Sequence, residues 1–361
     1  MFYHLLYPLS KYFTPFNVFR YITFRAAMAS LMALLLGLMA GPRIIELLRK
    51  LNIREDTEKK DSAALKNLHQ TKKGTPTMGG LIILLSTLIP TIFWARLDNV
   101  YILFSLVVVS WLGLVGFLDD FLKLRFARRQ GLTASTKLFG QIGLGLVLGL
   151  FFYRVGGYHG LGVPFFKDLV IPLSWGYIFL VIVVMVASSN AVNLTDGLDG
   201  LAIGCMVMAT LTFGGIAYIT GHAHLSAYLM IPHVEGSGEI AIFCASLIGA
   251  SLSFLWFNTY PAQIFMGDTG ALALGGAIGY VAIVLRQELL LFIVGGVFVI
   301  EAFSVILQVL SFKLTGKRIF ACAPLHHHLE IKGLAEPKVV VRFWILAALF
   351  ALLSLSTLKI R

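Results

Sequence analysis

Ten long apolar runs constrain the fold of this chain more than any other feature. The runs lie near residues 22–45, 78–95, 100–118, 138–153, 173–188, 200–219, 238–257, 270–285, 289–312 and 339–358. A helix of about 20 apolar residues crosses the hydrocarbon core of a bilayer, which is roughly 30 Å thick. Hydrophobic residues are 58% of the 361 and charged residues only 13%, a composition that a water-soluble globule of this length does not have. The sequence therefore predicts an all-α integral membrane protein with about ten transmembrane helices.

The runs follow one another with short connections, so we expect a single polytopic domain over residues 1–361. Residues 1–20 precede the first run and carry Pro8, Lys11 and Pro15 among aromatic side chains, which is typical of an interfacial N-terminal segment. The three cysteines are scattered and lack the C-x-x-C spacing of a zinc or redox site. Cysteine usage therefore gives no indication of redox chemistry.

Basic residues indicate how the chain is oriented in the membrane. Most of the 29 Lys and Arg fall in three segments between the runs, at 43–77, 119–137 and 313–338. The positive-inside rule places these segments in the cytoplasm, and both termini then lie outside, on the periplasmic side. This topology explains part of the net charge of +11, which also provides a field that attracts anionic lipid or phosphorylated substrates.

Five aspartates lie at the ends of apolar runs. They are Asp119 and Asp120 in GFLDDF, Asp196 and Asp199 in NLTDGLDG, and Asp268 in FMGDTG. A carboxylate in this position is costly, so it usually marks a metal, proton or substrate site. The expected topology puts all five on the cytoplasmic face, whereas a secondary transporter places its ionisable groups near the bilayer midplane. Clustered carboxylates beside basic loops favour magnesium-dependent chemistry on a phosphoanhydride, because carboxylates hold the cation while lysines neutralise phosphates.

Each acidic motif also has a purely structural interpretation. An acidic pair often marks the point where a helix leaves the bilayer, NLTDGLDG resembles a turn that caps a helix, and Asp268 is placed as an N-cap. Against this, Asp196 and Asp199 are three residues apart and share a helix face. Asn190 and Asn193 repeat that spacing one turn earlier. Capping explains one aspartate more easily than two.

Two further strings carry groups that suit a phosphorylated substrate. APLHHHLE holds three consecutive histidines at 326–328, which cannot all point one way on a helix, so we expect a loop that presents two of them. KKGTPTMGG fits either a membrane anchor with snorkelling lysines or a loop that grips phosphate. In the ninth run, Glu301 and Gln308 are seven residues apart on one helix face, where hydrogen bonding between helices is the simplest interpretation.

Five strings, in order across the ten runs, resemble one family. They are KKGTPTMGG, GFLDDF, NAVNLTDGLDGLA, FMGDTGALALGG and APLHHHLE. The chain resembles the MraY family, the bacterial phospho-N-acetylmuramoyl-pentapeptide transferases, within the polyprenyl-phosphate N-acetylhexosamine-1-phosphate transferase superfamily. The resemblance extends from residue 22 to 358. Its aspartate motifs are shared by the whole superfamily, whereas APLHHHLE and GTPTMGG point to the muramoyl-pentapeptide branch.

The resemblance implies a reaction at the cytoplasmic face of the bacterial inner membrane, with Mg²⁺ as cofactor. Undecaprenyl phosphate attacks the β-phosphate of UDP-MurNAc-pentapeptide and gives lipid I and UMP, which is the first membrane step of peptidoglycan synthesis. The implied partners are these two substrates and the lipid bilayer. The family also suggests a homodimer, and no nucleic acid partner is expected.

By motif, the resemblance makes Asp268 the main magnesium ligand. It makes Asp119, beside Asp120, either the base or the partner of the lipid phosphate, and His327 a further catalytic residue. The residues that it places at the substrates are Lys72, Thr77, Lys123, Lys137, Asn190, Asn193, Asp196, Gly197, Asp199, Asn258, Phe265, Gln308, His326, His327 and His328. Of these, the asparagine and the phenylalanine that precede Asp268 fall where the family holds uracil, for which an aromatic face is a natural platform.

Three alternatives remain open from the sequence. A superfamily relative would transfer GlcNAc-1-phosphate from UDP-GlcNAc, a secondary transporter would move a solute without releasing UMP, and a structural scaffold would show neither activity. Whether the lipid phosphate attacks directly or an aspartate first forms a covalent intermediate is also open. Direct attack is the simpler expectation, because the second pKa of a phosphate monoester is about 6 and little base strength is needed.

Overall fold

Helix α11 (Gly267–Val284) lies at the centre of the structure, a computed structural model that describes residues 1–51, 74–125, 131–166 and 169–359. Its sequence is rich in Gly and Ala, and small side chains allow neighbouring helices to approach closely. Of its apolar span, 89% is buried inside the protein. It packs mainly against α5 (Val100–Arg125) and α7 (Gly176–Thr195). The first turn of α11, which contains Asp268, is therefore held by the most enclosed part of the fold.

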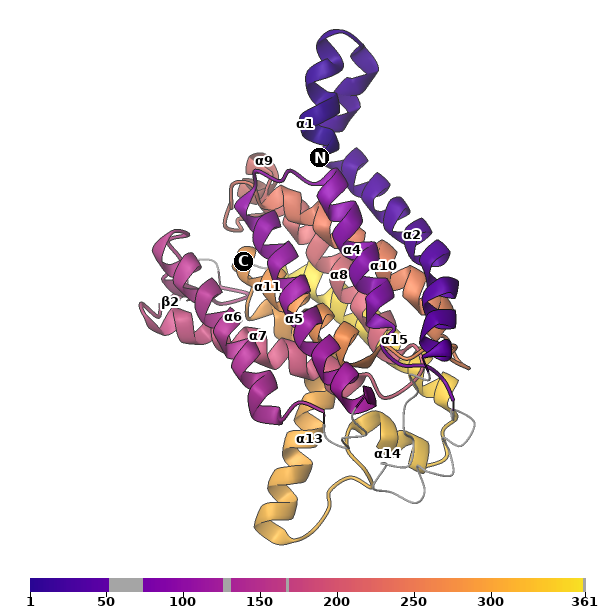
Figure 1. Ribbon diagram of the computed structural model, residues 1–361. Helices are drawn as coiled ribbons and strands as arrows, with labels where there is room; N and C mark the ends of the chain where they lie inside the picture. The colour runs from indigo at the N-terminus through magenta and orange to yellow at the C-terminus, as the bar shows by residue number, and fades with distance from the viewer. Residues whose placement is uncertain (52–73, 126–130, 167–168, 360–361) are drawn as a thin grey trace.

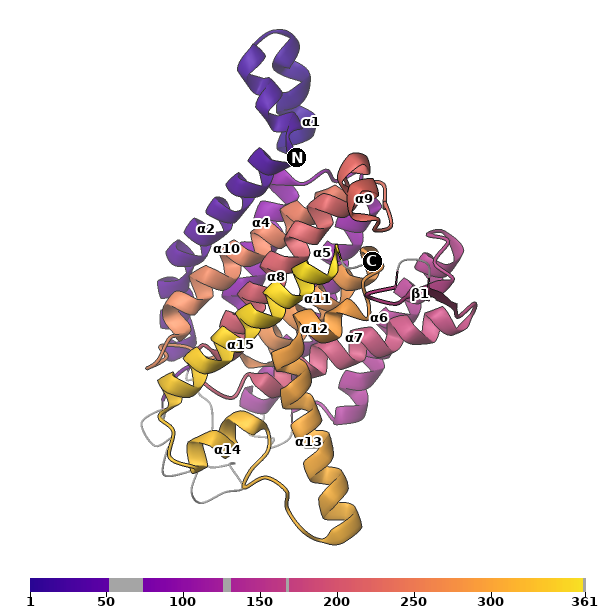
Figure 2. The same ribbon diagram turned by 180° about the vertical axis from the view of Figure 1, so that it is seen from behind.

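The other long helices surround this centre (Figures 1 and 2). They are α2 (Ile22–Lys50), α4 (Gly80–Trp94), α6 (Ala134–Arg154), α8 (Leu201–Thr220), α10 (Ile240–Asn258), α13 (Gly296–Thr315) and α15 (Glu336–Thr357). Helix α10 packs against α2, α4 and α8, α6 packs against α7, and α15 packs against α8. The outer helices expose many large apolar side chains, as expected of surfaces that face lipid.

Short elements connect the long helices. They are α1 (Phe2–Leu6), η1 (Tyr7–Lys11), η2 (Thr14–Arg20), α9 (Ala223–Leu229), η5 (Ser237–Glu239), α12 (Leu290–Val294) and α14 (Leu325–Ile331), together with the strands β1 (Gly160–Gly162) and β2 (Val170–Pro172). The two strands form an antiparallel hairpin in which Leu161 pairs with Ile171. The expectation of an all-α fold is therefore met apart from this one small hairpin in the described ranges.

Nine helices in the described part of the chain are long and apolar enough to cross a membrane, so this is a multi-pass membrane protein. The sequence predicted about ten. The remaining run, at 78–95, forms α4, an apolar helix of 15 residues. At 1.5 Å per residue α4 is roughly 22 Å long, shorter than the hydrocarbon core of a bilayer.

Three runs end differently from their prediction. Helix α5 continues past Asp119 and Asp120 to Arg125, and α7 continues to Thr195, well beyond residue 188. The run at 289–312 is divided at Gly295 into α12 and α13. Hydropathy marks where apolar residues stop, but a helix continues where its polar residues find partners, as Asp119 does with Lys123 one turn later.

The two ends of the bundle are different. Figures 1 and 2 show α13 and α14 extending from one end, and α1 with η1 and η2 extending from the other. Met1 and Lys359, the first and last described residues, are held at the end that carries α1. The Met1 amino group donates to the Ile92 carbonyl at 2.9 Å, and Lys359 Nζ donates to the Tyr228 carbonyl at 3.3 Å.

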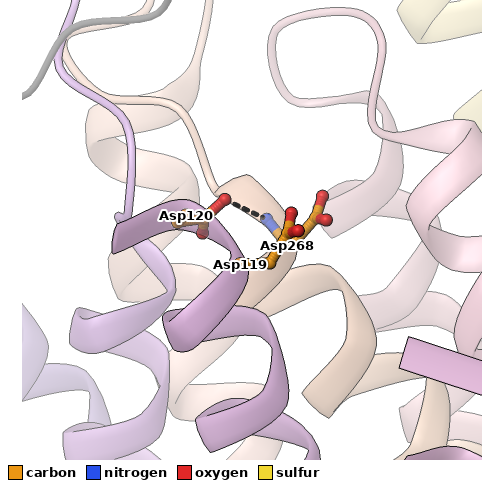
Figure 3. Close-up of side chains that lie close together, drawn as sticks. All are labelled: Asp119, Asp120 and Asp268. Atoms are coloured by element: carbon orange, nitrogen blue, oxygen red, sulfur yellow. Dashed lines mark hydrogen bonds between the residues drawn. The ribbon is translucent and has the colours of Figure 1, made fainter. Parts of the chain in front are cut away.

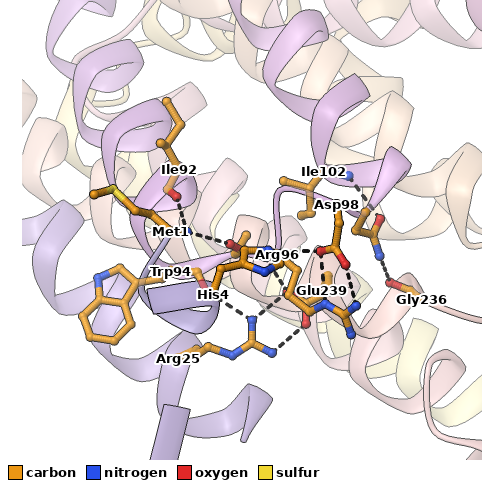
Figure 4. A network of polar contacts seen from close by, with 12 residues as sticks. Met1, His4, Arg25, Ile92, Trp94, Arg96, Asp98, Ile102, Gly236 and Glu239 are labelled. Carbon is orange, nitrogen blue, oxygen red and sulfur yellow. Dashed lines mark hydrogen bonds and ion pairs between the residues drawn. The ribbon is translucent and has the colours of Figure 1, made fainter. Parts of the chain in front are cut away.

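A buried ion pair holds the end near the termini together (Figure 4). Arg25 in α2 is 1% exposed, and its guanidinium donates to both carboxylate oxygens of Glu239 at 2.8 and 2.6 Å and to the Trp94 carbonyl at 3.2 Å. The Arg96 backbone N–H donates to the same carboxylate at 3.0 Å. This bidentate geometry satisfies two charges that would otherwise be costly to bury, and it connects α2 and α4 to η5, which leads directly into α10.

Candidate active site

Three carboxylates from two helices face one another at the opposite end of the bundle (Figure 3). Asp119 and Asp120 are buried near the end of α5, and Asp268 lies half-buried in the first turn of α11. One oxygen from each side chain lies within 4.8 Å of the other two. Carboxylates at such short range repel one another, so the cluster requires positive charge beside it.

Two lysines supply that charge. Lys123 Nζ lies 2.5 Å from Asp119 Oδ2 and 3.4 Å from Asp268 Oδ2. Lys137, at the start of α6, lies 2.8 Å from the same oxygen of Asp119 and also contacts Asp268. Both lysines were predicted as phosphate-contacting residues near the acidic pair. The structure places their ammonium groups directly between the carboxylates, partly exposed to solvent.

Asp120 connects α5 to the first turn of α11. Its carboxylate accepts from the Thr269 hydroxyl at 2.7 Å, the Thr269 backbone N–H at 3.0 Å and the Asp268 backbone N–H at 3.3 Å. It therefore caps the first turn of α11, where backbone N–H groups have no partner within the helix. Gly267 precedes this turn with φ of +72°, and a Cβ there would lie 2.6 Å from Asp120 Oδ2. Glycine is thus required both by the backbone conformation and by the close carboxylate.

The segment before α4 reaches the cluster from the other side. The Phe265 N–H donates to the Pro76 carbonyl at 2.8 Å, and the Gly79 N–H donates to the Phe265 carbonyl at 2.8 Å. This pairing places Thr77, a predicted substrate residue, so close to Gly267 that a Cβ on that glycine would lie 3.0 Å from the threonine hydroxyl. Lys72, predicted from the same string, lies outside the described residues.

Asp199 and Asn258 hold the connection between α10 and α11. Asp199 Oδ2 accepts from the Ala262 N–H at 3.0 Å, and Asn258 accepts from the Gly200 N–H at 3.0 Å while donating to the Ile264 carbonyl at 2.9 Å. Both side chains are buried. The two residues predicted to line the nucleotide side therefore bind backbone groups here, and they fix the loop that carries Phe265 to the end of α7.

The other predicted residues of the NLTDGLDG region lie along α7 and just after it. Asn190 donates to Gln141 Oε1 of α6 at 2.9 Å and to the Val186 carbonyl at 2.8 Å. Asn193 lies one turn later, and Asp196 follows the last residue of α7; both are half-buried. Asn190 and Asn193 share α7, but Asp196 and Asp199 follow its last residue, Thr195, so the expectation that these two aspartates share a helix face is wrong.

The three histidines lie on a short helix, α14, and the expectation of a loop is wrong. Each imidazole has a different partner, because successive residues of a helix point about 100° apart. His326 Nδ1 lies 3.2 Å from Glu301 of α13, His327 Nδ1 lies 2.8 Å from Glu330, and His328 Nδ1 accepts from the Ala321 N–H at 3.0 Å. Burial and, to a smaller extent, the nearby Lys332 lower the pKa of His328.

Gln308 of α13 binds the segment that leads to α14. Its side-chain oxygen accepts from the N–H groups of Ile319 at 3.1 Å and Phe320 at 2.9 Å, and its amide donates to the Phe320 carbonyl at 3.0 Å. The expected hydrogen bonding between helices is confirmed for Glu301, which accepts from the His326 N–H of α14, whereas Gln308 binds the segment before α14. Both connect α13 to the histidine region.

Sequence reasoning found the acidic centre but missed several of its supports. Thr269, Gln141 and Glu330 each bind a predicted site residue and were not singled out. The Asp-Thr pair in FMGDTG carried a usable signal, because a hydroxyl next to a helix N-terminus commonly binds a carboxylate or an N–H group. Nothing in the sequence indicated that Gln141 would meet Asn190.

The donor set fits a hard divalent cation. Mg²⁺ prefers oxygen ligands at about 2.1 Å, so opposite ligands lie roughly 4 Å apart. The carboxylate oxygens of Asp119, Asp120 and Asp268 meet this spacing, and Asp268 is the most exposed of the three. With Lys123 and Lys137 beside them, the residues suit a cation that bridges phosphate oxygens.

Comparisons with known proteins identify the family. The glycosyl transferase family 4 model matches residues 101–286, and signature 1 of phospho-N-acetylmuramoyl-pentapeptide-transferase matches residues 72–84. A phospho-N-acetylmuramoyl-pentapeptide-transferase of Desulfotalea psychrophila is 52% identical over 367 residues, and that of Nitratidesulfovibrio vulgaris (strain DP4) is 50% identical over 363 residues; each match covers 100% of both chains. On this evidence, the chain belongs to the phospho-N-acetylmuramoyl-pentapeptide-transferase (MraY) family.

Proposed function

We propose that this protein transfers phospho-MurNAc-pentapeptide from UDP-MurNAc-pentapeptide to undecaprenyl phosphate, giving lipid I and UMP. Full-length identity of about half to proteins with this name supports the activity. The observation that carries it is the meeting of Asp119, Asp120 and Asp268 with Lys123 and Lys137 at one end of a membrane bundle. A soluble nucleotide sugar and a lipid phosphate are both able to reach a site in this position.

The protein acts, in this proposal, in the bacterial cytoplasmic membrane with its acidic centre on the cytoplasmic face and both termini outside. The positive-inside rule supports this orientation, since most Lys and Arg fall in the segments 43–77, 119–137 and 313–338 of the sequence. Two contacts agree with it: Met1 and Lys359 are both held at the other end of the bundle. The proposed homodimer rests on the family alone.

Mg²⁺ is the proposed cofactor, with Asp268 as its main ligand and Asp119 and Asp120 beside it. When bound, the cation neutralises charge on the diphosphate. Lys123 and Lys137 have long, flexible stems and partly exposed ammonium groups, so they are available to phosphate oxygens as well as to the carboxylates. Two anionic substrates repel each other, and these positive groups offset that repulsion.

Direct attack is the proposed chemistry. An oxygen of the lipid phosphate forms a bond to the β-phosphorus, and the bond from that phosphorus to the bridging oxygen breaks as UMP leaves. The lipid phosphate is mostly deprotonated at neutral pH, since its second pKa is about 6. Asp119 then contributes by orienting the lysines and by its charge, because Lys123 and Lys137 both contact its Oδ2.

The nucleotide is proposed to bind between the end of α7 and the loop before α11. Asn190, Asn193, Asp196, Gly197 and Asp199 line one side, while Asn258 and Phe265 belong to the other. Phe265 is half-buried and offers an aromatic face for uracil. The histidine helix α14 and Gln308 are proposed to contact the phosphates and the sugar-peptide part.

A single assay tests this function. Purified protein in detergent is mixed with undecaprenyl phosphate and either UDP-MurNAc-pentapeptide or UDP-GlcNAc, with and without EDTA, and UMP release and lipid product are measured. We expect UMP and lipid I from the muramoyl substrate alone, loss of both with EDTA, and recovery when excess Mg²⁺ is added.

The other outcomes separate the alternatives. UMP from UDP-GlcNAc but not from the muramoyl pentapeptide would assign the protein to another branch of the superfamily. No UMP from either substrate, with solute uptake in proteoliposomes, would indicate a transporter. Turnover that persists in EDTA would remove the metal from the proposal while leaving the transfer in place.

A further inference from the structure

Glu301 is a buried carboxylate that the proposed reaction does not use. It lies in α13 among apolar residues and is fully buried, as is His326 of α14. His326 Nδ1 lies 3.2 Å from Glu301 Oε2, and the His326 backbone N–H points to the same oxygen at 3.5 Å. An ionisable group inside a membrane helix is costly without a partner, and this imidazole is the partner that the structure provides.

The other edge of the same imidazole faces the NLTDGLDG loop. A Cβ built on Gly197 would lie only 2.2 Å from His326 Nε2 and 2.9 Å from Cε1, so the ring rests against the Cα of this glycine. Gly197 follows Asp196 and stands two residues before Asp199, within the proposed nucleotide side. One histidine therefore connects a carboxylate of α13 to the loop between α7 and α8.

We propose that Glu301 is a positioning residue for His326 and, through it, for the nucleotide side of the site. A carboxylate 3.2 Å from Nδ1 favours the tautomer with its proton on Nδ1, which leaves an unprotonated Nε2 beside Gly197. The proposal rests on the transferase function proposed above. It assigns to Glu301 no contact with either substrate.

The neighbouring histidines support a separate role for this pair. His327 meets Glu330, which lies three residues later on the same short helix, and His328 meets the Ala321 N–H just upstream. The His326 contact reaches from α14 to Glu301 of the membrane helix α13. Gln308 holds the preceding segment to α13, two turns from Glu301. These contacts leave the orientation of His326 to Glu301.

The first test is a double-mutant cycle with Glu301→Gln and His326→Ala. If Glu301 acts through the imidazole, each single variant should lower kcat/KM for UDP-MurNAc-pentapeptide by about 10- to 100-fold. The double variant should be no worse than His326→Ala alone, because the group that Glu301 orients is already gone. Losses that multiply would overturn the proposal, since they would mean that Glu301 supports the site independently of His326.

Matched variants separate positioning from general stability. Ser304→Ala changes a buried side chain three residues along α13 whose hydroxyl donates to the Glu301 backbone carbonyl and touches no predicted site residue among those described, so its kcat/KM should match the wild type. Glu301→Asp keeps the charge and should recover part of the activity that Glu301→Gln loses. Equal losses in Glu301→Asp, Glu301→Gln and Ser304→Ala would point to packing and contradict the proposal.

A second cycle remains decisive if Glu301→Gln does not fold. Gly197→Ala should lower kcat/KM in the wild-type background, because its methyl group would meet the imidazole. The same change should have a smaller effect in His326→Ala, where that side chain is absent. An equal loss in both backgrounds would show that the imidazole does not lie against this loop in the working enzyme.

A spectroscopic readout separates this proposal from the proposed function. In NMR spectra of protein carrying ¹⁵N-labelled histidine, the His326 signal is identified as the one lost in His326→Ala. In the wild type this signal should show a proton on Nδ1. It should change in Glu301→Gln but not in Ser304→Ala. This result is expected even if the wild type releases no UMP. In that case the proposed transferase function would be wrong, while the proposed role of Glu301 in positioning His326 would still hold. A His326 signal that Glu301→Gln leaves unchanged would overturn the positioning role.

Discussion

Within the acidic cluster, three aspartates of the same chemistry have different surroundings. Asp120 is 4% exposed and accepts three hydrogen bonds from Asp268 and Thr269, which makes it part of the start of α11. Asp119 accepts from the Leu132 N–H at 2.7 Å and contacts both lysines. Asp268 is the most exposed, and its side chain lies against Lys123, Lys137 and the carboxyl group of Asp119. These differences allow structural and chemical roles to be separated by substitution.

We expect Asp268→Asn to abolish transfer while leaving stability almost unchanged, and Asp120→Asn to reduce both. The first variant removes a cation ligand from a half-buried position, which should cost at least about 100-fold in kcat. The second weakens charge-assisted bonds to N–H groups in a buried place, which should cost about 1–3 kcal/mol of unfolding free energy. UMP release and thermal unfolding in detergent measure the two effects. Equal melting temperatures for both variants would contradict the distinction.

At this scale the sequence could identify the residues but not their partners. Asp119, Asp120 and Asp268 stood out because carboxylates are rare at the ends of apolar runs. That Lys123 and Lys137 would lie between them, and that Asn258 would bind two backbone groups, depends on contacts between distant parts of the chain. Local patterns carry no information about such pairs.

Two helices that carry the cluster approach each other through glycine. A Cβ at Gly116 of α5 would lie 2.2 Å from the Asp268 carbonyl oxygen, and one at Gly80 of α4 would lie 2.1 Å from the Gly270 nitrogen. Neither obstacle is a flexible side chain that moves away easily. The position of Asp268 relative to Asp119 is therefore set by backbone contact between α4, α5 and α11.

Gly116→Ala should consequently separate α5 from α11 and disturb the cluster without changing any polar residue. Overpacking of this kind costs about 1–3 kcal/mol, and we expect a lower melting temperature together with reduced kcat. Gly143→Ala in α6 is the control, because nothing lies within 4 Å of a Cβ there and alanine favours the helix by up to about 1 kcal/mol. Normal activity in Gly116→Ala would mean that the two helices tolerate a wider spacing.

Hydropathy predicted the existence of the long helices better than their ends. It stopped at residue 118 for α5 and at 188 for α7, although both helices continue through polar residues that have partners. It also joined α12 and α13, which are separated at Gly295. The short helix α14 was not expected, because its three histidines carry no apolar periodicity.

Across the whole molecule, charged groups are concentrated at the two ends of the bundle. The acidic cluster with its lysines lies at one end, and Arg25 with Glu239 lies at the other. A further buried acid, Glu288, lies between α11 and α12, and the Tyr177 hydroxyl donates to it at 2.5 Å. Nearby, the Arg286 guanidinium lies 3.9 Å from the centre of the Tyr158 ring. Each end thus contains carboxylates whose ionisation affects the stability of the fold.

Glu288 gives the fold a pH dependence with a definite sign. Burial raises the pKa of Glu288 from 4.5 to about 7, so the unfolded chain releases this proton first as the pH rises. The neutral carboxyl stabilises the fold fully below pH 4.5, and this stabilisation is lost as the pH rises to about 7, by an amount on the order of 3 kcal/mol. Glu288→Gln does not titrate, so its melting temperature should rise relative to the wild type over this range. A constant difference between the two proteins would contradict the assignment.

The connection between α10 and α11 joins the two halves of the proposed site. Asn258 attaches it to Gly200, and its later residues pair with the segment before α4 and lead directly into Asp268. A short link that is hydrogen-bonded near both ends should transmit displacement instead of absorbing it. A ligand that shifts the loop after α7 should therefore also shift the carboxylate of Asp268, and occupancy of one half of the site should be mechanically communicated to the other.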